Sequence, residues 1–348
     1  MAFDIDGVLL RGKQPVASAA AALRALQRAS VPFVLLTNGG GYPEATKAAA
    51  LSQLLDVEIA AEQVILSHTP MRELAADYGD RLVLVVGKRY DQLRAIAAAY
   101  GFKRVITIEE LHGQHPTLYG DVEVDPALSA RVEAWHAPIH AVLALTDPVL
   151  WGRELQLTCD VLRSCTGQPG SDDGGDGPQV PLYSACADFE YTAEPPVPRF
   201  GSGAFHFALD ALYRASVGRE LETVRFGKPE ATCVKTFLIL SNFVTEFSTK
   251  FNMYIIVVRR SFAFAERLID AQAAAIGSPA PTTLYMVGDN PLTDIQGAVS
   301  AGGRWRAVLT QSGMFTGGVE ENAALDSPAH ILVSEVGEIV DILGLSQD

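Results

Sequence analysis

Short apolar runs that alternate with helical segments constrain the fold of this chain most. Val31–Leu36 and Leu82–Val86 are continuous apolar runs, which is typical of strands covered on both faces. Segments such as Ala17–Ala29 and Glu44–Leu55 carry helix-forming residues at helical spacing. The same alternation returns around the strand expected at Thr283–Val287. Strands that alternate with helices predict an α/β fold with a parallel sheet.

The chain is long enough for more than one domain. A length of 348 residues favours two domains, or one core that carries a large insertion. The pattern changes between Val105 and Val197, where a glycine-, aspartate- and proline-rich loop spans Gly167–Pro181. We therefore expect a smaller α/β domain at residues 105–197, inserted into a core formed by residues 1–104 and 198–348.

The charge balance excludes several classes of partner. The chain has 27 Lys and Arg residues against 41 Asp and Glu residues, a formal net charge of −14. An acidic surface repels phosphate backbones and anionic lipids, so nucleic acid and membrane surfaces are not expected as general partners. The longest clean apolar run, Met253–Val258, is far shorter than the ~20 residues of a membrane span. The four cysteines form no CxxC pair, so neither a disulfide scaffold nor a zinc site is expected.

Three of the expected strands end in polar clusters. These clusters are Asp4 with Asp6, Thr37 with Asn38, and Asp289 with Asn290 and Asp294. Taken singly, each cluster is more simply explained as a turn or a helix cap. In an open parallel sheet, however, the carboxyl ends of the strands lie along one edge, where ligands bind. Together with Lys228, the three clusters predict a functional site.

The residue types in these clusters suit phosphoryl transfer. Several carboxylates in one cleft need a cation, and oxygen ligands suit Mg²⁺. Asp4 is the candidate nucleophile, which would form an acyl phosphate. Asp6 would protonate the leaving oxygen and then activate water. Thr37 and Lys228 would hold the phosphoryl oxygens.

The constellation resembles the haloacid dehalogenase-like (HAD) superfamily. The residues that carry the resemblance are Asp4-Ile5-Asp6-Gly7-Val8-Leu9, Thr37-Asn38-Gly39, Gly227-Lys228-Pro229 and Gly288-Asp289-Asn290-Pro291-Leu292-Thr293-Asp294. An acid two residues after the nucleophile is the phosphotransferase pattern of that superfamily. The large insert after the second motif is similar to subfamily IIA, which implies a Rossmann-like core with a C2-type α/β cap.

The resemblance also implies roles for individual residues. Mg²⁺ would be bound by the Asp4 carboxylate, the Asp6 backbone carbonyl and Asp289, with Asn290 and Asp294 in support. The substrate phosphate would contact Thr37, Asn38, Gly39 and Lys228. The segment Tyr183–Tyr191 would be the specificity loop of the cap. Asp188 is its candidate polar contact, although an exposed loop acid is an alternative.

A narrower resemblance covers most of the chain. Leu66–Met71, Thr146–Trp151 and Pro198–Phe205 are similar to the cat-eye-syndrome critical region protein 5 family. That resemblance implies a eukaryotic, often mitochondrial protein with no defined substrate; the cytoplasm is expected otherwise. Any transit segment is expected to lie outside this chain, because only three residues precede Asp4. A homodimer formed through the cap is a candidate assembly.

One segment departs from the family pattern. Lys228 and Asp289 lie 61 positions apart. The resemblance implies a shorter spacing between these two motifs. The surplus corresponds to Val234–Arg260, which has no clean hydrophobic period. A translated intron is one hypothesis and a lineage-specific insertion is the other. We expect the segment to protrude from the core as poorly packed helix or irregular chain.

These observations lead to one main hypothesis and two alternatives. The main hypothesis is a Mg²⁺-dependent phosphatase that hydrolyses a small phosphorylated metabolite through an aspartyl-phosphate. The first alternative is a catalytically weak or silent module that binds a phosphorylated ligand or a protein partner. The second alternative is a phosphomutase, which the sequence alone does not exclude.

Overall fold

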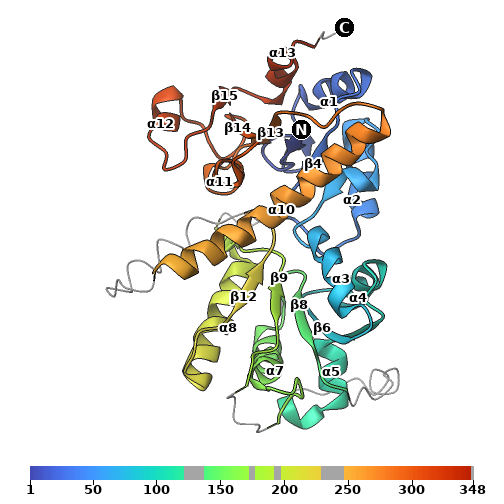
Figure 1. The fold of residues 1–348 in the computed structure, drawn as a ribbon, viewed down its shortest axis with the longest axis vertical. Helices are drawn as coiled ribbons and strands as arrows, with labels where there is room; N and C mark the ends of the chain where they lie inside the picture. Colours follow the sequence, from blue (N-terminus) through green and yellow to red (C-terminus); the bar gives the residue numbers. More distant parts are fainter. Residues whose placement is uncertain (121–136, 172–176, 192–196, 229–246, 346–348) are drawn as a thin grey trace. The chain divides into compact units, whose positions relative to one another are not determined.

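The chain folds into two compact units, each with its own parallel sheet. The computed structural model describes residues 1–120, 137–171, 177–191, 197–228 and 247–345, with no side-chain description for residues 247–259 (Figure 1). The first unit comprises residues 1–38, 44–70 and 227–348. The second unit comprises residues 39–43 and 71–226.

The first unit is built on a six-stranded parallel sheet, as the alternation of strands and helices predicts. Its strand order is β15-β14-β13-β1-β4-β5. The strands are β1 (Ala2–Phe3), β4 (Val34–Leu36), β5 (Val64–Ile65), β13 (Leu284–Gly288), β14 (Trp305–Thr310) and β15 (Ile331–Val333). β1 pairs with β13 on one side and with β4 on the other, so the order of strands reverses beside β1. Such a switch point is where open α/β sheets bind ligands.

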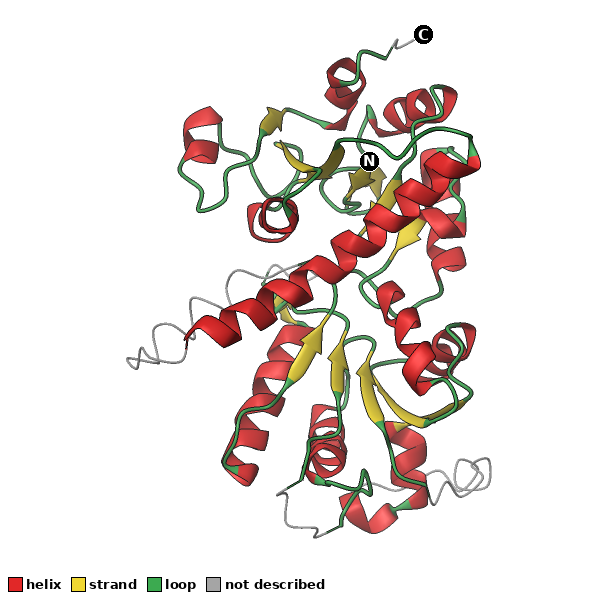
Figure 2. Cartoon of the chain, in the orientation of Figure 1, coloured by secondary structure: helices red, strands yellow, loops and turns green. Residues whose placement is uncertain are grey.

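Helices cover this sheet through apolar faces of helical spacing. Phe262, Ala265 and Ile269 of α10 (Phe247–Ala275) pack with Val34 and Met286 of the sheet, and Figure 2 shows the helix in red. Burying three such side chains contributes several kcal/mol, at about 1.5–3 kcal/mol for each large one. The other helices of the unit are α1 (Ala19–Arg28), α2 (Glu44–Leu55), α11 (Gln296–Ala301), α12 (Val319–Ala323) and α13 (Ile339–Ile342). Short elements complete it: the hairpin β2 (Leu10–Arg11) and β3 (Gln14–Pro15), the 3₁₀ turns η1 (Ala61–Gln63) and η5 (Val336–Glu338), and the π-helical turn η4 (Pro291–Ile295).

The second unit contains a five-stranded parallel sheet with the order β12-β9-β8-β6-β7. Its strands are β6 (Leu82–Val86), β7 (Arg104–Thr107), β8 (Ala141–Ala144), β9 (Leu182–Ser184) and β12 (Thr223–Arg225). Leu82 and Leu84 belong to one apolar cluster and Val83 and Val85 to another, because alternate side chains of a strand point to opposite faces. Both faces are therefore buried. This explains why β6 reads as a continuous apolar run.

Several helices and a short hairpin surround this second sheet. They are η2 (Thr69–Leu74), α3 (Ala75–Tyr78), α4 (Tyr90–Ala99), α5 (Ile108–Gln114), η3 (Pro116–Tyr119), α7 (Trp151–Arg163) and α8 (Ser202–Val217), with the antiparallel pair β10 (Glu190–Tyr191) and β11 (Arg199–Phe200). Phe205, Leu209 and Tyr213 of α8 are fully buried in one of the apolar clusters. Among the described residues, no helix combines the length and the apolar character needed to cross a membrane.

The boundaries of the second unit differ from the expected 105–197. The unit begins at Met71 and ends at Phe226, and it also takes in residues 39–43. The reason is strand pairing: β6 pairs with both β7 and β8, and β12 pairs with β9. Residues 71–104 and 198–226 therefore complete the second sheet, although their alternation of strands and helices matches that of the first.

The described residues include only part of the segment Val234–Arg260. Residues 234–246 lie outside the described residues, so the expectation that they protrude stays a prediction. Residues 247–260 form the first part of α10, which continues through Glu266 as one helix. The structure thus joins the end of the segment to the helix expected around Glu266.

A buried histidine makes the stability of the second unit depend on pH. His206 Nε2 lies 2.6 Å from Ser184 Oγ inside the unit. Burial, helped by the positive charge of Arg225, lowers the pKa of His206 to about 3 from its ordinary value of 6.5. Between those two values the unfolded chain binds a proton that the folded chain does not. The contribution of His206 to the free energy of unfolding is therefore fully present above pH 6.5 and is lost as the pH falls toward 3.

We expect the free energy of unfolding to fall by up to about 1.4 kcal/mol per pH unit below pH 6 through this one group. Urea unfolding at pH 7, 6 and 5 measures the slope. His206→Gln should flatten it, whereas His330→Gln, at an exposed histidine of the first unit, should not. Equal slopes in wild type and His206→Gln would contradict the assignment.

Candidate active site

The turn after β1 carries the first two acidic residues. The backbone N–H of Asp4 donates to Val287 O (2.8 Å), which keeps Asp4 in register with β13. The chain then turns, and the Gly7 N–H donates to Leu10 O (2.6 Å). Asp4 is buried, whereas the Asp6 side chain is exposed. The turn therefore gives the two carboxylates different surroundings, as their proposed roles require.

Gly7 is required in this turn for two physical reasons. Its φ is +90°, in the region that favours glycine. A Cβ atom added there would lie 2.1 Å from Asp289 Oδ2, well inside contact distance. The backbone of Gly7 thus packs directly against the Asp289 carboxylate.

The end of β13 supplies two more carboxylates. Asp289 Oδ2 accepts a hydrogen bond from the Met314 N–H (2.7 Å). Asp294 lies in η4, and its Oδ2 accepts from the Asn290 N–H (3.1 Å). The Asn290 side chain caps η4 by accepting from the Leu292 N–H (2.9 Å). Asn290 thus fixes the start of η4, and its support of a metal ion stays a prediction.

Lys228 is the cation that faces these carboxylates. Its Nζ forms ion pairs with Asp4 and with Asp294 Oδ1, the latter at 2.6 Å. The lysine side chain is only 4% exposed. Its backbone N–H donates to Asn38 Oδ1 (2.6 Å), and Asn38 Nδ2 donates to Lys228 O (3.4 Å). Asn38, expected among the substrate-binding residues, holds the Lys228 backbone in place here.

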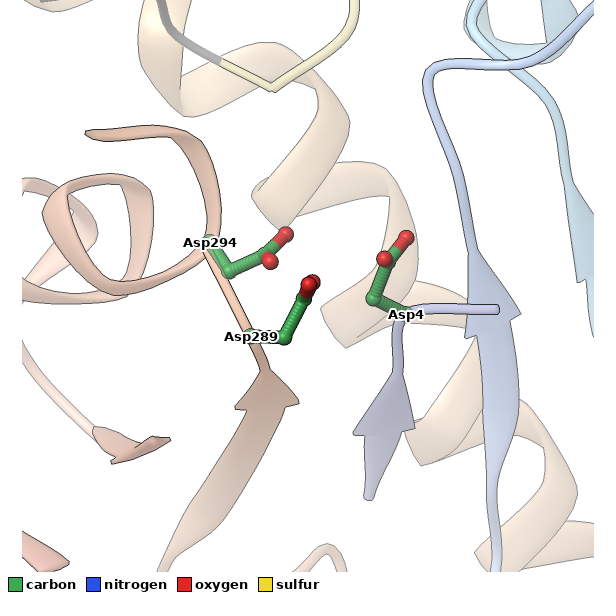
Figure 3. A group of neighbouring side chains, drawn as sticks. All are labelled: Asp4, Asp289 and Asp294. Atoms are coloured by element: carbon green, nitrogen blue, oxygen red, sulfur yellow. The ribbon is translucent and has the colours of Figure 1, made fainter. Parts of the chain in front are cut away.

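Three carboxylates gather around this single lysine. Figure 3 shows Asp4, Asp289 and Asp294 pointing toward one another, and one oxygen from each lies within 4.8 Å of the others. All three residues are buried. The arrangement therefore carries more negative than positive charge in a region with little water.

The pKa values follow from this crowding. Burial raises the pKa of Asp4 well above its ordinary value, against the opposing effect of Lys228. Burial, and then the charge of Asp294, raise the pKa of Asp289 to about 6. The pKa of Lys228 is raised, because its two carboxylate partners outweigh the lowering effect of burial. A hard cation with oxygen ligands would relieve the remaining repulsion, so the residues fit Mg²⁺.

The remaining predicted residues fall in two places. Thr37 follows β4 in the first unit, is buried, and donates its N–H to Ile65 O (3.0 Å). Gly39 and Asp188 belong to the second unit. Asp188 is half-buried in the loop after β9, where its carbonyl accepts from the Gly203 N–H (2.9 Å). The structure thus brings together Asp4, Lys228, Asp289 and Asp294, with Thr37 and Asn38 in the same unit.

One part of the site was missed in the sequence. The loop after β14 contributes Ser312, Gly313 and Met314, which contact the Gly7 turn or Asp289. The signal was available, because the polar cluster Thr310-Gln311-Ser312-Gly313 directly follows the short apolar run Ala307–Leu309, where a strand forms. Extending the rule for strand ends to this strand would have found it.

The sequence of the chain is similar to known hydrolases. Sequence models of two families match, "haloacid dehalogenase-like hydrolase" over residues 1–103 and "HAD-hydrolase-like" over residues 263–339. The chain is 31% identical over 340 residues to a cardiolipin synthase (CMP-forming)/mitochondrial hydrolase fusion protein of Schizosaccharomyces pombe. That match covers 95% of this chain, which spans about half (50%) of the relative's length. It is also 29% identical to a mitochondrial hydrolase of Saccharomyces cerevisiae, over 91% of this chain and 88% of that protein.

A solved structure shares the fold. The 4-nitrophenylphosphatase of Thermotoga maritima superposes with a TM-score of 0.60 and 18% sequence identity. The match covers 98% of this chain and 95% of that one. At this identity the likeness concerns the fold.

The unbalanced charge predicts a strong response to loss of Lys228. In metal-free buffer, Lys228→Met should reduce stability by about 3–5 kcal/mol, because it leaves buried carboxylates without a counter-charge. Added Mg²⁺ should raise the Tm of the variant more than that of wild type. Thermal unfolding with EDTA and with Mg²⁺ measures both effects. The control is Lys103→Met, which removes an exposed ion pair with Asp80 and should leave the Tm nearly unchanged; equal losses in the two variants would contradict the prediction.

Proposed function

Since this chain belongs to the haloacid dehalogenase-like hydrolases, we propose that it hydrolyses a small phosphomonoester through an aspartyl-phosphate, with Mg²⁺ as cofactor. The observation that carries the proposal is the buried group of Asp4, Asp289, Asp294 and Lys228 beside the switch point of the first sheet. A nucleophilic carboxylate, a charge-neutralising lysine and a set of oxygen ligands are the parts that this chemistry needs. The fold shared with a 4-nitrophenylphosphatase supports the same reaction class.

Asp4 is the nucleophile in this proposal. A bond forms between an Asp4 carboxylate oxygen and phosphorus, and the bond from phosphorus to the ester oxygen breaks. Attack requires the ionised carboxylate. The ion pair with Lys228 acts in that direction, against the raising effect of burial on the pKa of Asp4. When bound, Mg²⁺ would supply further charge stabilisation, held by the Asp4 carboxylate, the Asp6 backbone carbonyl and Asp289.

Asp6 is the general acid and base. Its carboxyl group gives a proton to the leaving oxygen as the ester bond breaks, so the product is a neutral alcohol. The resulting carboxylate then takes a proton from the water that attacks the aspartyl-phosphate. That second attack releases inorganic phosphate and restores both aspartates. The exposed position of the Asp6 side chain supports this role, since it must meet the substrate and water.

Thr37 and Lys228 bind the transferring phosphoryl group. The raised pKa of Lys228 keeps its ammonium charged at neutral pH. Both residues are buried, and Lys228 pairs with Asp4 and is bound by Asn38, the neighbour of Thr37 in the chain, which supports a shared role. Gly39 and Asp188, from the second unit, are assigned to substrate binding, and Asn38 assists by fixing the Lys228 backbone.

The two units act as core and cap. The first unit holds the reacting groups, and the second corresponds to the C2-type cap that selects the substrate. The names of the two fungal relatives support a mitochondrial location.

An exposed aromatic patch on the second unit supports a homodimer. The side chains of Phe189, Phe200 and Phe207 are 37%, 61% and 56% exposed, and the Phe189 ring lies 5.9 Å from that of Phe200 and 6.1 Å from that of Phe207. Large exposed apolar patches mark interaction surfaces. A two-fold dimer would bury the patch of each copy against the other.

Light scattering coupled to size-exclusion chromatography tests the dimer. Wild type should have the mass of two chains, and Phe207→Glu should shift it toward one chain, because a charge would have to be buried. Val319→Glu, at an exposed apolar residue of the first unit, is the control and should remain dimeric. A wild-type protein with the mass of one chain would refute the assembly.

Activity assays test the catalytic proposal. Purified protein should release phosphate from phosphomonoesters with Mg²⁺ and not with EDTA. Asp4→Asn should abolish turnover, because the near-isosteric amide cannot attack phosphorus. Asp80→Asn, at an exposed ion pair, should leave activity unchanged. Acid quenching during turnover should trap phosphate on wild type and none on Asp4→Asn.

The outcomes separate the proposal from the silent-module alternative. Activity of Asp4→Asn above one-tenth of wild type would refute the nucleophile. Wild-type protein that binds inorganic phosphate but hydrolyses no ester with Mg²⁺ would instead favour the silent module.

A further inference from the structure

The loop that follows β14 ties together two parts of the site. Ser312 Oγ donates a hydrogen bond to the Gly7 carbonyl (2.7 Å), and Ser312 is 4% exposed. Ser312 and Gly7 lie 305 positions apart in the chain. A buried hydroxyl that donates to a backbone carbonyl in a turn restrains that turn, and losing such a bond leaves the carbonyl unsatisfied.

Two further contacts orient this serine. Arg11 Nε, from β2, donates to the Ser312 carbonyl (2.6 Å). Ser312 Oγ also lies 3.1 Å from Thr310 Oγ1. Because a hydroxyl has a single hydrogen, the shorter contact, to the Gly7 carbonyl, is the one to which Ser312 donates. The side chain and the backbone of Ser312 are thus both fixed against the Gly7–Arg11 turn.

The same loop fixes Asp289. The Met314 N–H donates to Asp289 Oδ2, and a Cβ atom added to Gly313 would lie 1.9 Å from that oxygen. The backbone of Gly7 approaches the same oxygen from its own side, since a Cβ there would lie 2.1 Å away. The carboxylate expected to bind the metal is therefore packed between this loop and the turn that carries Asp6, and the loop contacts both.

The Gly7 turn needs such a restraint. Glycine has more accessible backbone conformations than any other residue. Among the described residues, the Asp6 side chain has no bonding partner, so its position depends on the backbone that carries it. That backbone is held on one side by the Gly7 N–H bond to Leu10 O and on the other by Ser312.

We infer that Ser312 is a positioning residue for proton transfer: by holding the Gly7 carbonyl it holds Asp6 where the leaving oxygen must receive its proton. This inference rests on the proposed function, in which Asp6 is the general acid. It predicts that the effect of losing Ser312 depends on the leaving group. Loss of the Ser312 hydroxyl should impair reactions whose leaving group needs a proton more than reactions whose leaving group departs as a stable anion.

The enzymatic test compares two substrates through kcat/KM, which covers the steps up to phosphorylation of Asp4. The leaving group of glycerol 2-phosphate needs a proton, whereas that of 4-nitrophenyl phosphate does not. Ser312→Ala should lower kcat/KM for glycerol 2-phosphate by about 10-fold or more, within the range of general acid catalysis, and that for 4-nitrophenyl phosphate by no more than about 3-fold. Ser312→Thr, which keeps the hydroxyl, should restore the first value.

Two exposed residues provide matched variants. Arg11→Ala removes the second tie to Ser312 at an exposed position and should give a weaker form of the same substrate-dependent loss. Arg306→Ala is the control, because this exposed arginine of β14 donates only to backbone carbonyls of Gly303 and Trp305 among the described residues, and it should change neither value. Equal losses on both substrates in Ser312→Ala and Arg11→Ala would overturn the inference, because a general structural defect produces that result.

Amide hydrogen exchange tests the same inference without turnover. In Ser312→Ala, amides of residues 5–10 should exchange faster than in wild type, while those of β4 and β13 keep their protection. Unchanged protection of residues 5–10 would overturn the inference whatever the activity. Failure of the proposed function has a different signature, since wild type would then hydrolyse neither ester with Mg²⁺ while the exchange experiment still reports on the turn.

Discussion

The repulsion among three buried carboxylates is the constraint on which this structure depends. Burial raises the pKa of Asp4 and of Asp289, and so favours their neutral forms. The fold opposes this with one lysine and with backbone N–H groups aimed at individual oxygens, such as that of Met314. These groups come from segments far apart in the chain. Much of the first unit therefore serves to hold like charges close together. Their repulsion lowers the stability of the fold, which indicates that the arrangement is kept for its chemistry.

The topology of the sheet explains how that frame is assembled. β1 lies between β4 and β13, so three strand ends and the loop after β14 open on the same edge. Asp4 can then meet Asp289 across a single strand spacing. Lys228 reaches the same point because Asn38, at the end of β4, binds its backbone through both side-chain polar atoms. The second sheet has the same parallel construction, with both faces buried, and is complete in itself.

The sequence predicted the parallel α/β class and the convergence of Asp4, Asp289 and Asp294, because both follow from apolar runs that end in polar residues. Lys228 was added through the Gly227-Lys228-Pro229 motif. The sequence did not predict which sheet each strand joins. β6 reads like a strand of the core, since apolar content reports burial and not the identity of the neighbouring strand. Nor did it predict that Asn38 binds Lys228, or that Ser312 binds Gly7, because hydrogen bonds between distant segments depend on geometry that local patterns do not contain. For the part of Val234–Arg260 outside the described residues, protrusion from the core stays a prediction.

Glycines enclose the acidic group where side chains would be expected. A Cβ atom at Gly7 or Gly313 would meet Asp289, and one at Gly288 would meet Asp294. The walls around these carboxylates are therefore main chain, whose dimensions are the same in every protein. Substitutions of side chains elsewhere in the core therefore change the space around these carboxylates little, so the reactive centre is conserved in shape as the sequence diverges. Divergence of the enzyme toward new substrates is then left to surfaces built from side chains, and a lineage can exchange its metabolite without rebuilding its chemistry.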